Sequence, residues 1–112
     1  MKVTHEEHGD IMVLGLIGNI TIGEGDITLR REVNKALESG FKKIVLDLKK
    51  VKYVDSSGVG EMVAAYTTVK NKEGELKLVN LNSKILDLLQ ITALVTVFTI
   101  HDTKKEALES FA

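Results

Sequence analysis

Residues 43 to 63, "KIVLDLKKVKYVDSSGVGEMV", join a buried strand to a helix and decide the fold. The run "KIVLDL" (43–48) is short, apolar and rich in β-branched residues, which is typical of a buried strand. Beyond the polar block that follows, apolar residues recur at i, i+3, i+4 and i+7: Val59, Met62, Val63 and Tyr66. This spacing predicts a helix over about 57–72 that packs these side chains against the sheet.

Similar patterns on both sides of this stretch predict the other elements. Residues 2–18 form two extended segments that meet at a turn, His8-Gly9-Asp10. Asp26 is placed to cap a helix that ends near Ser39. Gly40 follows that helix, where a glycine in the left-handed conformation commonly ends a helix. That helix has an apolar face of Leu29, Val33, Ala36 and Leu37. The remaining elements are a strand at 75–81, a helix capped by Asn82 or Ser83 with Ile85, Leu88 and Leu89 inward, a strand at 95–100, and a closing helix at 103–111 with Ala107, Leu108 and Phe111 inward.

The order of these elements is β-β-α-β-α-β-α-β-α. Alternation of this kind predicts an α/β fold with a mixed, mostly parallel sheet, about four helices and right-handed crossovers. A chain of 112 residues is near the commonest domain size, so a single domain over residues 1–112 is expected. Because residues 43–48 have the apolar pattern of a buried strand, this strand is expected at the centre of the sheet.

The composition excludes several classes of protein. The chain is 44% hydrophobic, with a net charge of −1 and no cysteine. This balance predicts no nucleic-acid binding, disulfides or thiol chemistry. The longest early apolar run, "IMVLGLIG", is eight residues, whereas a membrane span needs about 20. The first residues also lack the apolar core of a signal peptide. A cytoplasmic protein that does not bind a membrane is therefore expected.

No enzyme motif fits the "DSSGVG" block at 55–60. A nucleophile elbow, G-x-S-x-G, fails because Val54 and Asp55 stand two residues before the two serines. A P-loop fails because Glu61 follows Gly60 where lysine is required. A dinucleotide fingerprint fails because its third glycine would fall on Val63. Neither an enzyme nor a bound cofactor is predicted.

Isolated polar residues elsewhere have ordinary structural explanations. His5 and His8 lie three apart on a strand, so they point to opposite faces and do not form a metal site. His101 and Asp102 end a strand and precede or cap the last helix. Asp47, inside an apolar strand, is a catalytic candidate, but a carboxylate bound to neighbouring backbone groups is the commoner case. No metal ion is expected.

The block "DSSG" itself has two interpretations that the pattern weighs about evenly. Asp55, Ser56 or Ser57 could each cap the helix, which explains one polar residue but not three followed by glycines. Alternatively, a serine hydroxyl is displayed at a helix N-terminus, where the helix dipole tolerates a phosphate. Gly58 and Gly60 would then keep the surroundings bare for a protein partner.

Residues 42–63, together with the paired N-terminal strands and the "LVNLNSKILDLLQITAL" region, resemble STAS domains, specifically bacterial anti-anti-sigma factors. Members of this family bind an anti-sigma factor that is also a serine kinase, and so free the sigma factor. The resemblance implies that the kinase phosphorylates Ser56, which ends binding, and that a serine phosphatase reverses it. It implies no catalysis by this chain, and a monomer when free.

The resemblance also implies a set of partner-binding residues: Asp55, Ser57, Gly58, Val59, Gly60, Asn19, Thr21 and Glu24. The family often has G-E-L-D after the second strand, whereas this chain reads "GNITIGEG", with Asn19 and Thr21 in place of both acids. Glu24 and Asp26 are the nearby acids that could substitute. A STAS scaffold or interaction subunit without phosphorylation is the alternative, and a small hydrolase using Ser56 or Ser57 comes third for want of a base.

Overall fold

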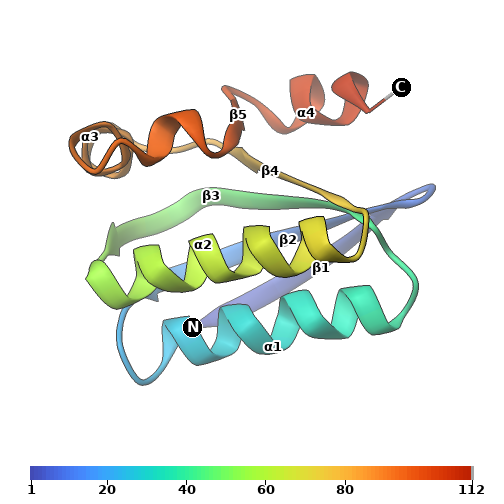
Figure 1. Cartoon of the computed structure of the whole chain (residues 1–112), viewed down its shortest axis with the longest axis horizontal. Coiled ribbons are helices and arrows are strands. Elements are labelled where there is room, and N and C mark those ends of the chain that lie inside the picture. The colour runs from blue at the N-terminus through green and yellow to red at the C-terminus, as the bar shows by residue number, and fades with distance from the viewer. Residues whose placement is uncertain (112) are drawn as a thin grey trace.

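The structure is a computed structural model that describes residues 1–111. Its elements alternate as the sequence predicts (Figure 1). In chain order they are β1 (Lys2–His8), β2 (Ile11–Ile20), α1 (Gly25–Glu38), β3 (Lys43–Val54), α2 (Ser56–Asn71), β4 (Glu75–Val79), α3 (Ser83–Ile91), the 3₁₀ turn η1 (Leu94–Thr96), β5 (Thr99–His101) and α4 (Lys104–Ser110).

The five strands form one mixed sheet in the order β1-β2-β3-β4-β5. The pair β1–β2 is antiparallel, and the other three pairs are parallel. The predictions of a mixed, mostly parallel sheet and of a central "KIVLDL" strand are confirmed. Strand β3 is longer than the predicted 43–48, because the buried side chains of Val51 and Val54 continue its inner face and Val54 still pairs with Ile20 of β2.

The helices cover the two faces of the sheet unequally. One face packs against α1 and α2, which lie side by side in Figure 1, and α3 adds Ile85 and Leu89 to the same core. The other face is covered in part by α4, whose Ala107 is fully buried against Val45 and Val79. Met62 of α2 is also fully buried, so the predicted inward face of this helix is confirmed.

One predicted helix cap is wrong, and the structure decides between the alternatives left open at two others. Helix α1 begins at Gly25 with Glu24 in the cap position, so Asp26 lies in the first turn, where its carboxylate accepts a bond from the Ile27 N–H (2.7 Å). At the last helix, the cap is Thr103, whose hydroxyl accepts a bond from the Glu106 N–H (3.1 Å). His101 and Asp102 therefore precede that helix and do not cap it. Asn82 caps α3, as one of the two predicted alternatives.

Two predicted strands are shorter than their apolar runs. β4 ends at Val79, because Asn80 has φ of 59° and leaves the extended conformation. The run at 95–100 begins in the turn η1, and only its end belongs to β5. Ala93, with φ of 60°, directs the chain into that turn, so apolar residues that resemble a strand are bent.

Candidate functional site

The candidate site lies where β3 passes into α2, and its first component is Asp55. This residue is the N-cap of α2, and its Oδ1 accepts a bond from the Gly58 N–H at 2.7 Å. Its Oδ2 accepts a second bond, from the Ile22 N–H in the loop between β2 and α1, at 3.0 Å. These bonds, the one from Gly58 first, hold the pKa of Asp55 below its usual value because they favour the ionised carboxylate.

Asp55 is therefore the cap of α2, and neither serine side chain is needed for capping. Ser56 is the first residue of α2 and is exposed, whereas Ser57 is half-buried. The helix N-terminus carries a partial positive charge, so the Ser56 hydroxyl stands where added negative charge is stabilised. The two interpretations of "DSSG" are thus compatible, with capping at one residue and display at the next.

The two glycines of the block have different structural roles. A Cβ on Gly58 would lie 2.0 Å from the Ile20 carbonyl oxygen, so this position must be glycine for α2 to approach the end of β2. Gly25, at the start of α1, makes the same kind of approach, and its Cβ would lie 2.2 Å from the Asn19 carbonyl oxygen. A Cβ on Gly60 would meet nothing within 4 Å. Gly60 therefore has no packing requirement and lies on an open surface.

The predicted residues between the end of β2 and the first turn of α1 divide into two groups. The bond between Asp55 and Ile22 attaches this loop to the start of α2, so the region of Asn19 and Thr21 adjoins the serine block. Glu24 is exposed, but its carboxylate pairs with the N-terminal amino group of Met1 at 2.8 Å, which lowers its pKa. Asp26 is held by its local bond to Ile27. Within residues 1–111, neither Glu24 nor Asp26 makes a hydrogen bond to the serines.

A cavity beside Ser56 was not predicted from the sequence. It has a volume of about 410 Å³ and opens between the end of β3, the start of α2 and α3. Its walls are largely apolar, with Tyr53, Val59, Ile85 and Leu88 among them. Figure 1 shows why it escapes sequence patterns: α3 reaches this end of the sheet only after the chain has passed through α2 and β4.

An ion pair fixes the helix that carries the site. Arg30 of α1 binds both carboxylate oxygens of Glu61 in α2, at 2.9 and 2.8 Å. Glu61 is only 7% exposed, so the bidentate pair compensates a buried charge one turn beyond the serines. Both helices therefore present their N-terminal ends as one fixed surface.

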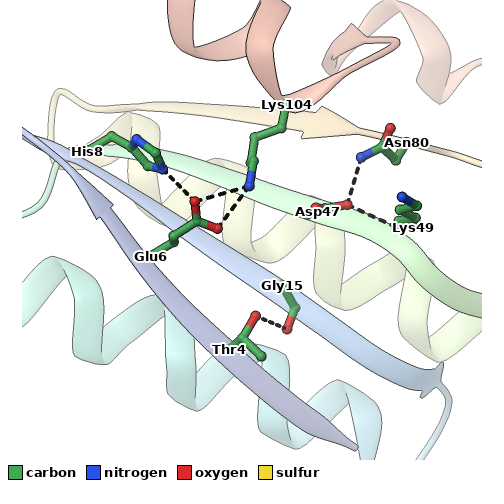
Figure 2. Close-up of polar contacts among 8 residues, drawn as sticks. All are labelled: Thr4, Glu6, His8, Gly15, Asp47, Lys49, Asn80 and Lys104. Carbon is green, nitrogen blue, oxygen red and sulfur yellow. Dashed lines mark hydrogen bonds and ion pairs between the residues drawn. The ribbon is translucent and has the colours of Figure 1, made fainter.

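The other polar candidates have structural roles, as Figure 2 shows. Asp47 Oδ1 accepts bonds from the Lys49 backbone N–H and from the Asn80 side chain, each at 3.0 Å. This confirms the structural explanation for Asp47, which holds Asn80 in its left-handed conformation.

His5 and His8 point to opposite faces of β1. His5 lies 3.4 Å from the Glu32 carboxylate on the α1 side. His8 lies 2.7 Å from Glu6, which also binds Lys104 of α4 (Figure 2). Within residues 1–111, no cluster of three potential metal ligands occurs, and no helix is both long and apolar enough to cross a membrane.

The chain is similar to proteins of a known family. The STAS domain family model matches residues 2–107. An anti-sigma F factor antagonist of Paenibacillus polymyxa is 27% identical over 109 residues, which cover 96% of this chain and 92% of that protein. An anti-sigma-B factor antagonist of Bacillus subtilis is 33% identical over 95 residues, covering 85% of this chain and 84% of that protein. The crystal structure of an anti-sigma factor antagonist from Mycobacterium paratuberculosis has the same fold, with a TM-score of 0.86 at 21% identity over 97% of this chain and 92% of that one.

Proposed function

This chain belongs to the STAS domain family, and from that premise we propose that it is an anti-sigma factor antagonist controlled by phosphorylation of Ser56. Its partner is an anti-sigma factor with serine kinase activity, and a serine phosphatase restores the unmodified form. The whole of residues 1–112 acts as one STAS domain and catalyses no reaction itself. The alignments with the two relatives named as antagonists cover 92% and 84% of those proteins. This coverage supports the assignment over a function that only a larger protein would have.

The observation that carries the proposal is the position of Ser56. Its side chain is exposed at the first residue of α2, directly after a cap residue that is held by two backbone N–H groups. A kinase needs an accessible hydroxyl on a backbone of defined shape, and this site offers both. A half-buried serine such as Ser57 is a poorer acceptor.

Phosphorylation changes the charge of the site more than its shape. A phosphate carries about −1.5 to −2 charges at neutral pH. At the start of α2 the helix dipole favours that charge in the free protein. In a complex the same charge is desolvated against a surface that was complementary to a neutral hydroxyl. Phosphorylation therefore opposes partner binding without unfolding the antagonist.

Asn19 and Thr21 favour a second candidate, a STAS interaction subunit that is not phosphorylated. They replace the two acids that the family often carries at and just after the end of β2, and the carboxylates of Glu24 and Asp26 are bonded to Met1 and Ile27 instead of to the serines. Co-purification from extracts of the source cell separates the two candidates. The first requires capture of a serine kinase that adds one phosphate to the purified protein, as measured by intact mass with ATP. A stable partner without kinase activity, and no change in mass, would support the second.

A further inference from the structure

The cavity beside Ser56 combines an apolar interior with a basic rim. Leu88 and Tyr53 contribute to its walls, and Tyr53 is 55% exposed, so part of this apolar surface is open to a partner. The exposed side chains of Lys52 and Lys84 also line it. Among the ion pairs within residues 1–111, none includes either lysine. The acid in the same wall, Asp55, has both carboxylate oxygens engaged by backbone N–H groups.

We propose that this cavity receives a segment of the anti-sigma kinase that has a large apolar side chain flanked by one or more carboxylates. The apolar side chain fills the space between α2 and α3, and the carboxylates pair with Lys52 and Lys84. The inference rests on the proposed function, since it identifies the part of the antagonist that anchors the kinase beside the serine the kinase modifies.

Charge and position select this occupant over a second copy of the chain. A twofold contact through this cavity would place Lys52 and Lys84 of one copy against the same residues of the other, and like charges across an interface oppose association. An acidic segment of another protein satisfies both lysines. Ser56 lines the same cavity, so a kinase segment seated there lies next to the acceptor hydroxyl.

The two lysines also suggest how phosphorylation of Ser56 opposes binding. A phosphate on Ser56 stands in the same cavity as Lys52 and Lys84 and attracts them. The lysines that pair with the carboxylates of the partner are then occupied by the phosphate of the antagonist itself. The switch acts by competition for these two cations in addition to direct repulsion.

The test is calorimetric titration of the cognate kinase with the unmodified protein and a set of variants. Leu88→Ser and Tyr53→Ser each remove apolar surface from the cavity, and the double variant Lys52→Gln/Lys84→Gln removes the basic rim. Each is expected to weaken binding about tenfold or more. Val97→Ser and Lys105→Gln are the controls, since both residues are exposed outside the cavity and are expected to change affinity less than about twofold. Tyr53 is exposed, so Tyr53→Ser still tests the apolar wall of the cavity even if Leu88→Ser unfolds the protein.

A second arm compares the phosphorylated and unmodified forms of the double lysine variant. Competition predicts that the loss of affinity on phosphorylation is at least about fivefold smaller in this variant than in the parent protein. If the cavity variants bind as tightly as the parent protein, the kinase docks elsewhere and the inference is wrong. If phosphorylation has the same effect with and without the lysines, competition is wrong. If the parent protein binds no kinase at all, the proposed function fails and the inference fails with it.

Discussion

The Asp55 carboxylate accepts a hydrogen bond from the Ile22 backbone N–H at 3.0 Å, across 33 residues of sequence. Through its other oxygen the same carboxylate caps α2. One side chain thus joins the β2–α1 loop to the helix that carries Ser56. Ile22 is 74% exposed, so this bond also fixes an apolar side chain on the surface beside the serine.

The first prediction concerns the pH dependence of that connection. The pKa of Asp55 is lowered in the folded protein, so its contribution to stability is complete above the unfolded pKa of about 3.9 and is lost as the pH falls through the folded value. Asp55→Asn keeps a good cap residue but has no charge to titrate. The difference in free energy of unfolding between the parent protein and this variant should therefore shrink as the pH is lowered below about 4, as measured by urea denaturation.

Other carboxylates with lowered pKa values, such as Glu6 and Asp10, are present in both proteins and cancel in this comparison. A stability difference that stays constant over the whole acid range would show that the ionised form of Asp55 has no special role in the fold.

The two glycines of the serine block provide a matched pair. Gly58→Ala should destabilise the protein by about 1–3 kcal/mol, because the new methyl group would overlap the Ile20 carbonyl. Gly60→Ala should stabilise it by about 0.5–1 kcal/mol, because the position is helical and the methyl group meets open space. If the bare surface at Gly60 serves a partner, this more stable variant should nevertheless bind the kinase more weakly. Equal stability changes at the two positions would contradict these roles.

The inner face of α2 gives a third prediction. Met62 is fully buried, so Met62→Ala should lower the free energy of unfolding by about 2–5 kcal/mol. Asn71→Ala, at the exposed end of the same helix, should change it by less than about 0.5 kcal/mol. Chemical denaturation of both variants measures the two changes in free energy of unfolding. If Met62→Ala lowers this free energy no more than the control does, a different face of α2 packs against the sheet.

Local patterns were sufficient to predict most of the fold. The helical spacing of Val59, Met62 and Tyr66 depends only on near neighbours in sequence, and so does the run at 43–48. The errors occurred where a tertiary contact or an unusual backbone conformation overrides a local signal. Val54 continues β3 because it pairs with Ile20, and Ala93 bends an apolar run that would otherwise extend a strand.

The candidate site was predictable only in part for the same reason. The order of residues within "DSSGVG" indicated a cap, a displayed hydroxyl and glycines with a special role. The sequence could not assign Gly58 to packing and Gly60 to open surface, because the neighbour that matters is Ile20. It also could not reveal the cavity, whose walls come from elements separated by β4.

The fourth prediction concerns the modified residue. Incubated with the cognate kinase and ATP, the protein should gain one phosphate, on Ser56. Ser57→Ala should still be phosphorylated, since Ser57 is half-buried and Ser56 remains exposed, whereas Ser56→Ala should not. Peptide mass spectrometry locates the phosphate, and its presence on Ser57 alone or on a threonine would overturn the assignment.

The affinity of the cognate anti-sigma kinase for three forms of the protein shows whether phosphorylation of Ser56 switches partner binding. The forms are the unmodified protein, the Ser56 phosphoprotein and Ser56→Ala, compared by titration calorimetry at one ionic strength. Like-charge contact across an interface costs several kcal/mol, and each 1.4 kcal/mol is about tenfold in affinity. The phosphoprotein should therefore bind the kinase at least about a hundredfold more weakly than the unmodified protein does. Ser56→Ala cannot be phosphorylated and should bind constitutively. Equal affinity of the phosphoprotein and the unmodified protein would contradict a switch at Ser56 and favour the STAS interaction subunit without phosphorylation.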